Sequence, residues 1–264
     1  MVLSAKSSIV AANKKYMCTQ TAKKINDTWY LSKTRDPVPY MKWEDEIKLF
    51  DSPSDKFKKY IIQNPNPKED GYYGGINEKG VAFISTFVPV DENQVSYIRR
   101  PYVRLILEAA TADEAIEIIK KFNPRIGGNM FVADANKCYG IESIPSEYFI
   151  EEITKPSVKT NHYFHFTNPN LQTLDTNPVH EWFIQWTHDR YDRAQELIEK
   201  ANSLEDLKNI LKDRKNSETK TSICLTKDEM ECCTYSAFIF DTKNIKAYYC
   251  QGNPLENEFK EYSF

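Results

Sequence analysis

Cys18 is the residue whose type and position most directly suggest chemistry, because it comes straight after a second methionine, Met17. If the chain began at Cys18, the freed α-amino group would have a pKa of about 8 and would lie within reach of the thiol. An amine in that position can act as the general base for its own side chain. The pattern therefore predicts a cysteine nucleophile at a new N-terminus, with no histidine required.

Two routes could expose Cys18. Residues 1–17 could be a propeptide removed by self-cleavage, or translation could start at Met17 and that methionine be removed. Other interpretations leave the thiol inert. A lone cysteine is more often a small core residue than a nucleophile, and the composition of SSIVAA and YMCTQT is also that of a plain first strand. We expect residues 1–17 to be removed and residues 18–264 to form one domain.

A charged segment, Lys33-Thr34-Arg35-Asp36, stands at the end of the second predicted strand. Such charges usually form a solvated turn that adds little to stability. At the mouth of a sheet they could instead hold the amine of a nucleophile and a carboxylate of a substrate. The segment alone does not decide between these two interpretations.

The composition is that of a globular protein, with 264 residues, 41% hydrophobic residues, 28% charged residues and a net charge of −3. Because there is no basic excess to attract phosphates, we expect no nucleic-acid partner. No apolar stretch is long enough for a membrane span or an export signal, so we expect a cytoplasmic protein without membrane contact. The six cysteines are too unevenly spaced for a disulfide framework, and no metal-ligand spacing occurs among them.

Hydrophobic periodicity predicts strands, a helical pair, strands, a second helical pair and strands, in the ranges 18–35, 101–122, 129–166, 180–211 and 236–252. Capping signals at Thr111 and Ser203 divide each helical region into two helices. Because each helical pair must bury its apolar face against a sheet, the order indicates an α+β fold with two sheets between helical layers.

The region from Asp36 to Asp70 is rich in proline, lysine and aspartate, which favours loops with at most a short helix around Trp43–Phe50. We expect it to be a lid or a pocket wall. The stretch GYYGGINEKG then holds four of the eight glycines and precedes the predicted strand VAFISTFVPV.

Several segments in chain order resemble the N-terminal-nucleophile hydrolases of the acyl-CoA:6-aminopenicillanate acyltransferase and choloylglycine hydrolase group. They are Cys18-Thr19, the strand ending in Arg35-Asp36, GGINEKGVAF (74–83), RLILEAATADEAIEII (104–119), NMFVADANKCYGIES (129–143), TNHYF (160–164) and DRYDRAQELI (189–198). The acyltransferase branch, which is peptidase C45-like, is the closer one. The resemblance runs from Cys18 to Pro254.

The resemblance implies a four-layer αββα sandwich of two mainly antiparallel sheets, and an enzyme that cleaves linear amide C–N bonds other than peptide bonds without a cofactor. Cys18 would be the nucleophile, and Asp36 matches the residue that holds its amine. Lys33 stands where the family has an arginine. Whether Lys33 or Arg35 does the work of that arginine stays open.

Asn161 matches the family asparagine that donates to the oxyanion, and its amide suits that role. Arg190 matches the arginine that completes the polar network behind the nucleophile, although on the sequence alone it is a helix-surface residue. A Cys18–His162 dyad is a further alternative. In a strand, however, His162 would point to the face opposite Asn161.

Three residues are candidates for substrate binding. Asn77 opens the GINEKG turn, where a left-handed turn residue is its alternative role. Thr86 and Phe87, in Ser85-Thr86-Phe87, lie where many family members carry a second oxyanion asparagine, and a backbone N–H could serve as the donor here.

The sequence thus predicts an amidohydrolase that forms a thioester on Cys18 and releases the acyl group to water or to another amine. The expected partner is a small-molecule amide, with a homo-oligomer left open. The alternative is an unprocessed protein of the same fold that keeps residues 1–17 and acts as a binding protein or by other chemistry.

Overall fold

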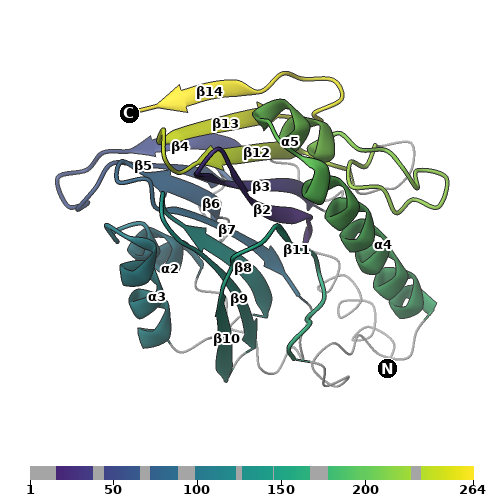
Figure 1. Cartoon of the computed structure of the whole chain (residues 1–264), viewed down its shortest axis with the longest axis horizontal. Coiled ribbons are helices and arrows are strands. Elements are labelled where there is room, and N and C mark those ends of the chain that lie inside the picture. Colours follow the sequence, from purple (N-terminus) through teal and green to yellow (C-terminus); the bar gives the residue numbers. More distant parts are fainter. Residues whose placement is uncertain are drawn as a thin grey trace, which may run out of the picture.

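The computed structural model of this chain describes residues 16–37, 45–65, 72–88, 99–122, 127–144, 146–166, 178–226 and 233–264. Two antiparallel sheets make up its centre (Figure 1). The first has the order β11-β2-β3-β12-β13-β14, with β1 paired to β3. Its strands are β1 (Tyr16–Met17), β2 (Gln20–Ile25), β3 (Thr28–Pro37), β11 (Ser157–Lys159), β12 (Ser236–Asp241), β13 (Lys246–Gln251) and β14 (Lys260–Ser263).

The second sheet has the order β10-β9-β8-β7-β6-β5-β4. Its strands are β4 (Glu46–Phe50), β5 (Lys59–Gln63), β6 (Tyr72–Asn77), β7 (Ala82–Phe87), β8 (Gly128–Ala133), β9 (Cys138–Ile144) and β10 (Glu147–Glu152). Leu31 and Phe240 of the first sheet pack with Ile84 and Phe131 of the second, so the largest apolar cluster lies between the sheets.

Each sheet carries a helical pair on its outer face (Figure 1). Helices α2 (Arg99–Ile106) and α3 (Ala112–Lys121) pack on the second sheet, and α4 (Pro178–Lys200) and α5 (Leu204–Leu211) pack on the first. The Thr111 hydroxyl accepts from the Glu114 N–H, and the Ser203 hydroxyl accepts from the Asp206 N–H. Both predicted caps are therefore confirmed, as is the α+β sandwich with its order of layers.

The Asp36–Asp70 region differs from the prediction. The segment predicted as a short helix, Trp43–Phe50, contains the strand β4 at Glu46–Phe50, and β5 follows where loops were expected. The helix prediction was wrong because the apolar residues of EIKLF alternate, and a five-residue edge strand satisfies that period equally well. Residues 38–44 and 66–71 lie outside the described residues, so the predicted lid is described only in its strands.

Two adjacent glycines of β6 allow close packing on both faces of the second sheet. A Cβ on Gly74 would lie 2.9 Å from the Phe238 ring of the facing sheet, and one on Gly75 would lie 2.6 Å from a methyl of Leu107, the residue after α2. The glycine-rich stretch is thus partly strand. Because Gly74 and Gly75 have no side chains, the facing sheet and the segment after α2 can pack close to the β6 backbone.

Two further segments, residues 160–166 and β14, differ from the sequence-based prediction. Strand character was predicted through HYFHF, but β11 ends at Lys159 and residues 160–166 form a loop. The final strand, β14, was not predicted because only four residues pair there, along the edge of β13.

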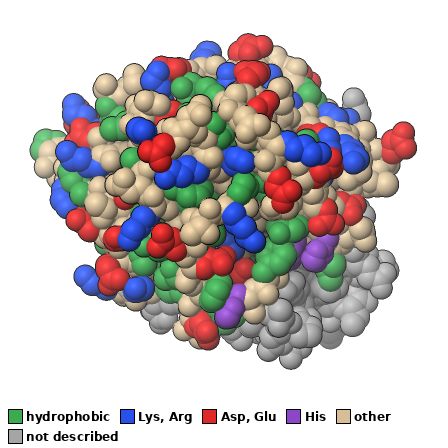
Figure 2. Space-filling view, in the orientation of Figure 1, with side chains coloured by type: hydrophobic (Ala, Val, Ile, Leu, Met, Phe, Trp, Pro, Cys, Tyr) green, Lys and Arg blue, Asp and Glu red, His purple; other side chains and the backbone are tan. Residues whose placement is uncertain are grey.

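The visible face of the molecule carries Lys and Arg side chains interspersed with Asp and Glu (Figure 2). No helix of the described residues has both the length and the apolar character that a membrane crossing requires.

Candidate active site

Cys18 lies two residues before β2, where the backbone pairing of β2 with β11 has ended. The β11–β2 register pairs Lys159 with Gln20, so its continuation by two residues sets Asn161 beside Cys18. At this position the Cys18 N–H does not bond to a backbone carbonyl of the neighbouring strand. It donates to the Asn161 side chain, at Oδ1, at 3.1 Å. Cys18 itself is 1% exposed. A nitrogen held by a side chain can keep that bond whether it belongs to a peptide or to an amine.

The Asn161 amide is fixed in orientation by four partners. Its Oδ1 accepts from Cys18 N and, at 2.8 Å, from Arg190 Nη2. Its Nδ2 donates to Thr86 Oγ1 at 2.9 Å and to the Phe87 carbonyl at 2.6 Å. Donation to an oxyanion stays a prediction, because both hydrogens of Nδ2 already have acceptors within the protein.

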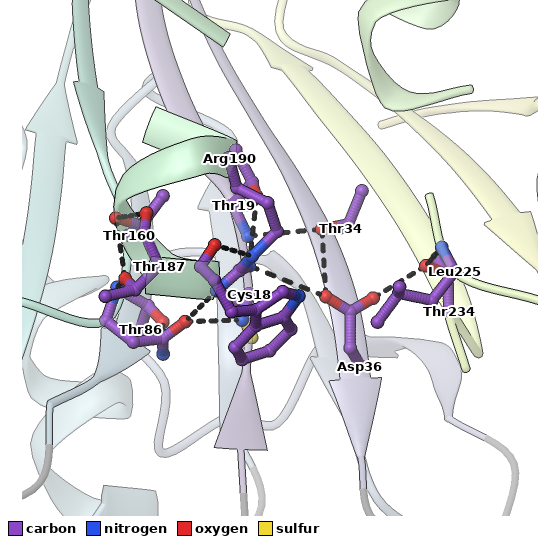
Figure 3. A network of polar contacts seen from close by, with 12 residues as sticks. Cys18, Thr19, Thr34, Asp36, Thr86, Thr160, Thr187, Arg190, Leu225 and Thr234 are labelled. Atoms are coloured by element: carbon purple, nitrogen blue, oxygen red, sulfur yellow. Dashed lines mark hydrogen bonds and ion pairs between the residues drawn. The ribbon is translucent and has the colours of Figure 1, made fainter. Parts of the chain in front are cut away.

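Arg190 comes from α4, is fully buried and lies beside Thr19 (Figure 3). Its guanidinium lies 3.6 Å from the centre of the Trp186 ring, and Nη1 donates to Thr19 Oγ1 at 3.1 Å. The same Nη1 is 3.9 Å from Asp36 Oδ2. Arg190 is therefore not a surface residue of the helix. It links Thr19, Asp36 and Asn161 into one network.

Asp36 is the buried carboxylate of this network (Figure 3). It accepts from Thr234 Oγ1 at 2.7 Å and from Thr34 Oγ1 at 3.4 Å, and the Thr34 hydroxyl in turn accepts from the Thr19 N–H. Burial raises the pKa of Asp36 from 3.8 to about 6, although the charge of Arg190 acts in the opposite direction. Thr234 is the residue of this network that sequence analysis missed, because a buried threonine has no distinguishing pattern.

Asp36 should make stability depend on pH. Its pKa is higher in the folded protein than in the unfolded chain, so between about pH 4 and about pH 6 the folded state binds more protons. The free energy of unfolding should therefore fall as pH rises through this window. Urea unfolding of the wild type and of Asp36→Asn at several pH values measures it. As pH rises, the free energy of unfolding of the wild type should fall relative to that of Asp36→Asn. A difference between the two free energies that does not change with pH would contradict the raised pKa of Asp36.

Lys33 and Arg35 both lie in β3 on the side that faces the second sheet. The Lys33 ammonium donates to the Ser85 carbonyl of β7. Arg35 pairs with buried Asp45 at 2.9 Å, and its guanidinium lies 3.5 Å from the centre of the Tyr73 ring. The continued β2–β3 register sets Arg35 across from Cys18. Asp45 was missed because it stands in a region that reads as charged loop.

His162 faces α4 and not Cys18. Its Nδ1 lies 3.1 Å from both the Thr160 and the Thr187 hydroxyl, and its ring stacks on His188 at 3.9 Å. Burial lowers the pKa of His162 to about 3. An imidazole with these contacts is a neutral packing group.

His162→Gln should therefore retain most of any Cys18-dependent turnover. We expect a loss of less than about tenfold, whereas removal of a general base costs about 100- to 10,000-fold. Steady-state kinetics on the folded variant, with its melting temperature as a check, measures this. A loss in the larger range would establish the dyad.

The remaining predicted residues divide into two groups. Thr86 and Phe87 contact Asn161 and so belong to the cluster. Asn77 does not, because its Nδ2 donates to the Leu107 and Ala109 carbonyls and its Oδ1 accepts from the Lys79 and Val81 N–H groups. These contacts favour a structural role at the turn over substrate binding. The expected left-handed conformation was wrong, because the residue with a positive φ in this turn is Gly80 and not Asn77. Within the described ranges, no group of three or more His, Cys, Asp and Glu side chains could hold a metal ion.

Comparison with known proteins gives one family and a set of solved folds. The sequence model of the acyl-coenzyme A:6-aminopenicillanic acid acyl-transferase family matches residues 22–256. No curated protein sequence matches the chain significantly.

Two of the similar solved structures are forms of the conjugated bile acid hydrolase from Clostridium perfringens. A cysteine-to-alanine mutant is 14% identical with a TM-score of 0.54, and an arginine-to-leucine variant is 16% identical with a TM-score of 0.53. Each alignment covers 94% of this chain and 97% of the other. At this identity the likeness shows the fold, which is the predicted αββα sandwich of N-terminal-nucleophile hydrolases.

Proposed function

This chain belongs to the acyl-coenzyme A:6-aminopenicillanic acid acyl-transferase family, and from that premise we propose that it hydrolyses small N-acyl amides with Cys18 as the nucleophile. The observation that carries the proposal is the position of the Cys18 nitrogen. That nitrogen bonds to Asn161 Oδ1, which Arg190 holds from the other side. Removal of residues 1–17 would turn this nitrogen into an amine already oriented beside its thiol.

The proposed reaction uses that amine as the base. The neutral amine takes the thiol proton, and the thiolate attacks the amide carbonyl to give a tetrahedral intermediate. The C–N bond then breaks, the leaving nitrogen takes the proton, and a thioester to Cys18 remains. Water, deprotonated by the same amine, adds to the thioester, and collapse of the second intermediate releases the acid and the thiol.

The charges around the amine support this assignment. In its protonated form the amine would keep its bond to Asn161 Oδ1, and the adjoining network of Thr19, Thr34 and Asp36 carries one carboxylate, which Arg190 balances. Since the site is buried, each of these contacts acts at low dielectric and strengthens the orientation. Carboxylate and guanidinium together keep the network close to neutral.

One observation favours the alternative of an unprocessed protein. Tyr16–Met17 forms strand β1, which continues the β2 register along β3 by pairing Met17 with Asp36. Residues that are paired in a sheet need not be removed. If they stay, the Cys18 nitrogen remains a peptide nitrogen and cannot act as a base.

Amide turnover tests the proposal. The panel should contain aliphatic and aromatic N-acyl amines, N-acyl amino acids, penicillin-like amides and conjugated bile acids, the last because similar folds are named for them. Release of free amine, together with a mass increase of one acyl group on the Cys18 peptide after acid quench, is the expected result. Turnover without acylation of Cys18 would contradict the mechanism, and transfer to an added amine would make acyl transfer the reaction.

A further inference from the structure

The loop that carries Asn161 belongs to neither sheet. Residues 160–166 follow β11, and their backbone N–H and C=O groups do not pair with a neighbouring strand. Thr160, Asn161 and His162 are nevertheless buried. Buried backbone N–H and C=O groups need partners. Most of these partners come from a single row of side chains on the facing sheet.

The row consists of Thr86, Asn129 and Glu142. The β7–β8 register pairs Thr86 with Asn129, and the β8–β9 register pairs Asn129 with Glu142. Directly paired residues project from the same face of a sheet. That face is the inner one, because Phe131, two residues beyond Asn129, packs in the cluster between the sheets. All three side chains of the row are buried.

Each member of the row holds the next part of the loop. Thr86 Oγ1 accepts from the Asn161 side chain at 2.9 Å. Asn129 Nδ2 donates to the carbonyls of Thr160 and His162, at 2.9 Å and 2.7 Å. Those carbonyls lie immediately before and after Asn161. Asn129 therefore holds the backbone on both sides of the residue that orients the Cys18 nitrogen.

Glu142 holds the far end of the same loop. Its carboxylate accepts from the backbone N–H groups of Phe164, His165 and Phe166 at distances of 2.9 to 3.3 Å. The Lys159 ammonium, one residue before the loop, lies 3.4 Å from Oε1. A carboxylate bonded to several N–H groups makes strong, directional contacts. Glu142 thus fixes both ends of the segment that carries Asn161.

We propose that Glu142, together with Asn129, is a positioning residue for Asn161 and, through Asn161, for the Cys18 nitrogen. Neither residue contacts Cys18, and sequence analysis assigned neither of them a role in the site. The inference rests on the proposed function only where it links this position to turnover.

Glu142→Gln and Glu151→Gln make a matched pair of variants. Glutamine at 142 keeps the shape but turns one N–H acceptor into a donor. Glu151 also approaches Lys159, at 3.9 Å, but it is half-exposed and touches no backbone of the loop. In Glu142→Gln we expect kcat to fall about 10- to 100-fold with KM nearly unchanged, because a small misplacement of the reacting groups is costly. Glu151→Gln should behave like the wild type.

A double-mutant cycle separates positioning from general support of the fold. If Glu142 acts through Asn161, Glu142→Gln should lower kcat in the wild type but not in Asn161→Ala. An equal loss of kcat in both backgrounds would overturn the proposal. If Glu142→Gln does not fold, Asn129→Ala replaces it in the same cycle, since it frees the carbonyls next to Asn161.

Amide hydrogen exchange gives a readout that does not need turnover. In Glu142→Gln the N–H groups of residues 164–166 should exchange faster than in Glu151→Gln. Where the chain keeps its Met17–Cys18 bond, the Cys18 N–H should also exchange faster, although Glu142 does not touch it. A wild type that turns over no amide would refute the proposed function and leave this test intact. Unchanged exchange at the Cys18 N–H in that uncleaved chain would overturn the positioning role.

Discussion

Cys18→Ala is expected to abolish amide turnover and to leave the fold intact. Loss of a nucleophile removes the covalent route, and the remaining hydrogen bonds cannot replace it, so the rate should fall by at least about a thousandfold. The Cys18 side chain is small, and the contacts of its nitrogen do not involve the sulfur. Steady-state kinetics and thermal unfolding of the same preparation measure both expectations.

Cys138→Ala is the matched control. Cys138 is also a fully buried free cysteine, but it lies in β9 within the cluster between the sheets and makes no contact with the site network. We expect it to lose some stability and to keep its turnover. A Cys18→Ala variant that still hydrolyses amides at a tenth of the wild-type rate or more would disprove the nucleophile assignment.

Arg190→Met is expected to produce the largest loss of stability among the site variants. It leaves the buried Asp36 carboxylate without its guanidinium and the Asn161 Oδ1 with one donor fewer. Removal of one partner of a buried pair typically costs about 3–5 kcal/mol of the free energy of unfolding. Urea unfolding measures the cost. It should be greater at pH 8 than at pH 5, because Asp36 can become neutral by protonation at low pH.

Arg193→Met, three residues further along α4, is the control for the loss of an arginine from this helix. Arg193 and its partner Asp213 are 17% and 13% exposed, whereas Arg190 and Asp36 are both 0% exposed. We expect a smaller cost than for Arg190→Met, because water can reach the carboxylate that Arg193→Met leaves behind. Equal losses in the two variants would show that the Arg190 network has no special weight.

The layer order was predictable from sequence because helices and strands differ in hydrophobic period. The caps at Thr111 and Ser203 each have a side-chain signature in the chain itself, and the structure places both as predicted. The strands β4 and β14 were not predictable in the same way. Each pairs on one side only and contains four or five residues, so its identity depends on the neighbouring strand.

In the site, too, some features were predictable from the sequence and others were not. Cys18 was singled out by its position after Met17, and Asp36, Asn161 and Arg190 through the resemblance. The structure brings the four into one cluster. The direction of each bond was not predictable. The sequence suggests that Asn161 is a donor, while the structure shows its oxygen bonded to the Cys18 nitrogen, because only the register of β11 sets Asn161 beside Cys18.

The buried positions of Asn129 and Glu142 show what sequence reasoning could not reach. Both residues stand in strands whose alternation is clear, and a polar residue at an inward position is a signal of a buried partner. The identity of that partner depends on the path of residues 160–166, which lies in a loop. Loop paths follow from long-range contacts, which one sequence does not contain.

The mass of the purified chain, with identification of its N-terminal residue, tests the central claim most directly. The account predicts an active protein that begins at Cys18, lacks residues 1–17 and loses its turnover when the α-amine is blocked. An active protein in which the bond between Met17 and Cys18 is intact would contradict it, because the proposed base would then be a peptide nitrogen.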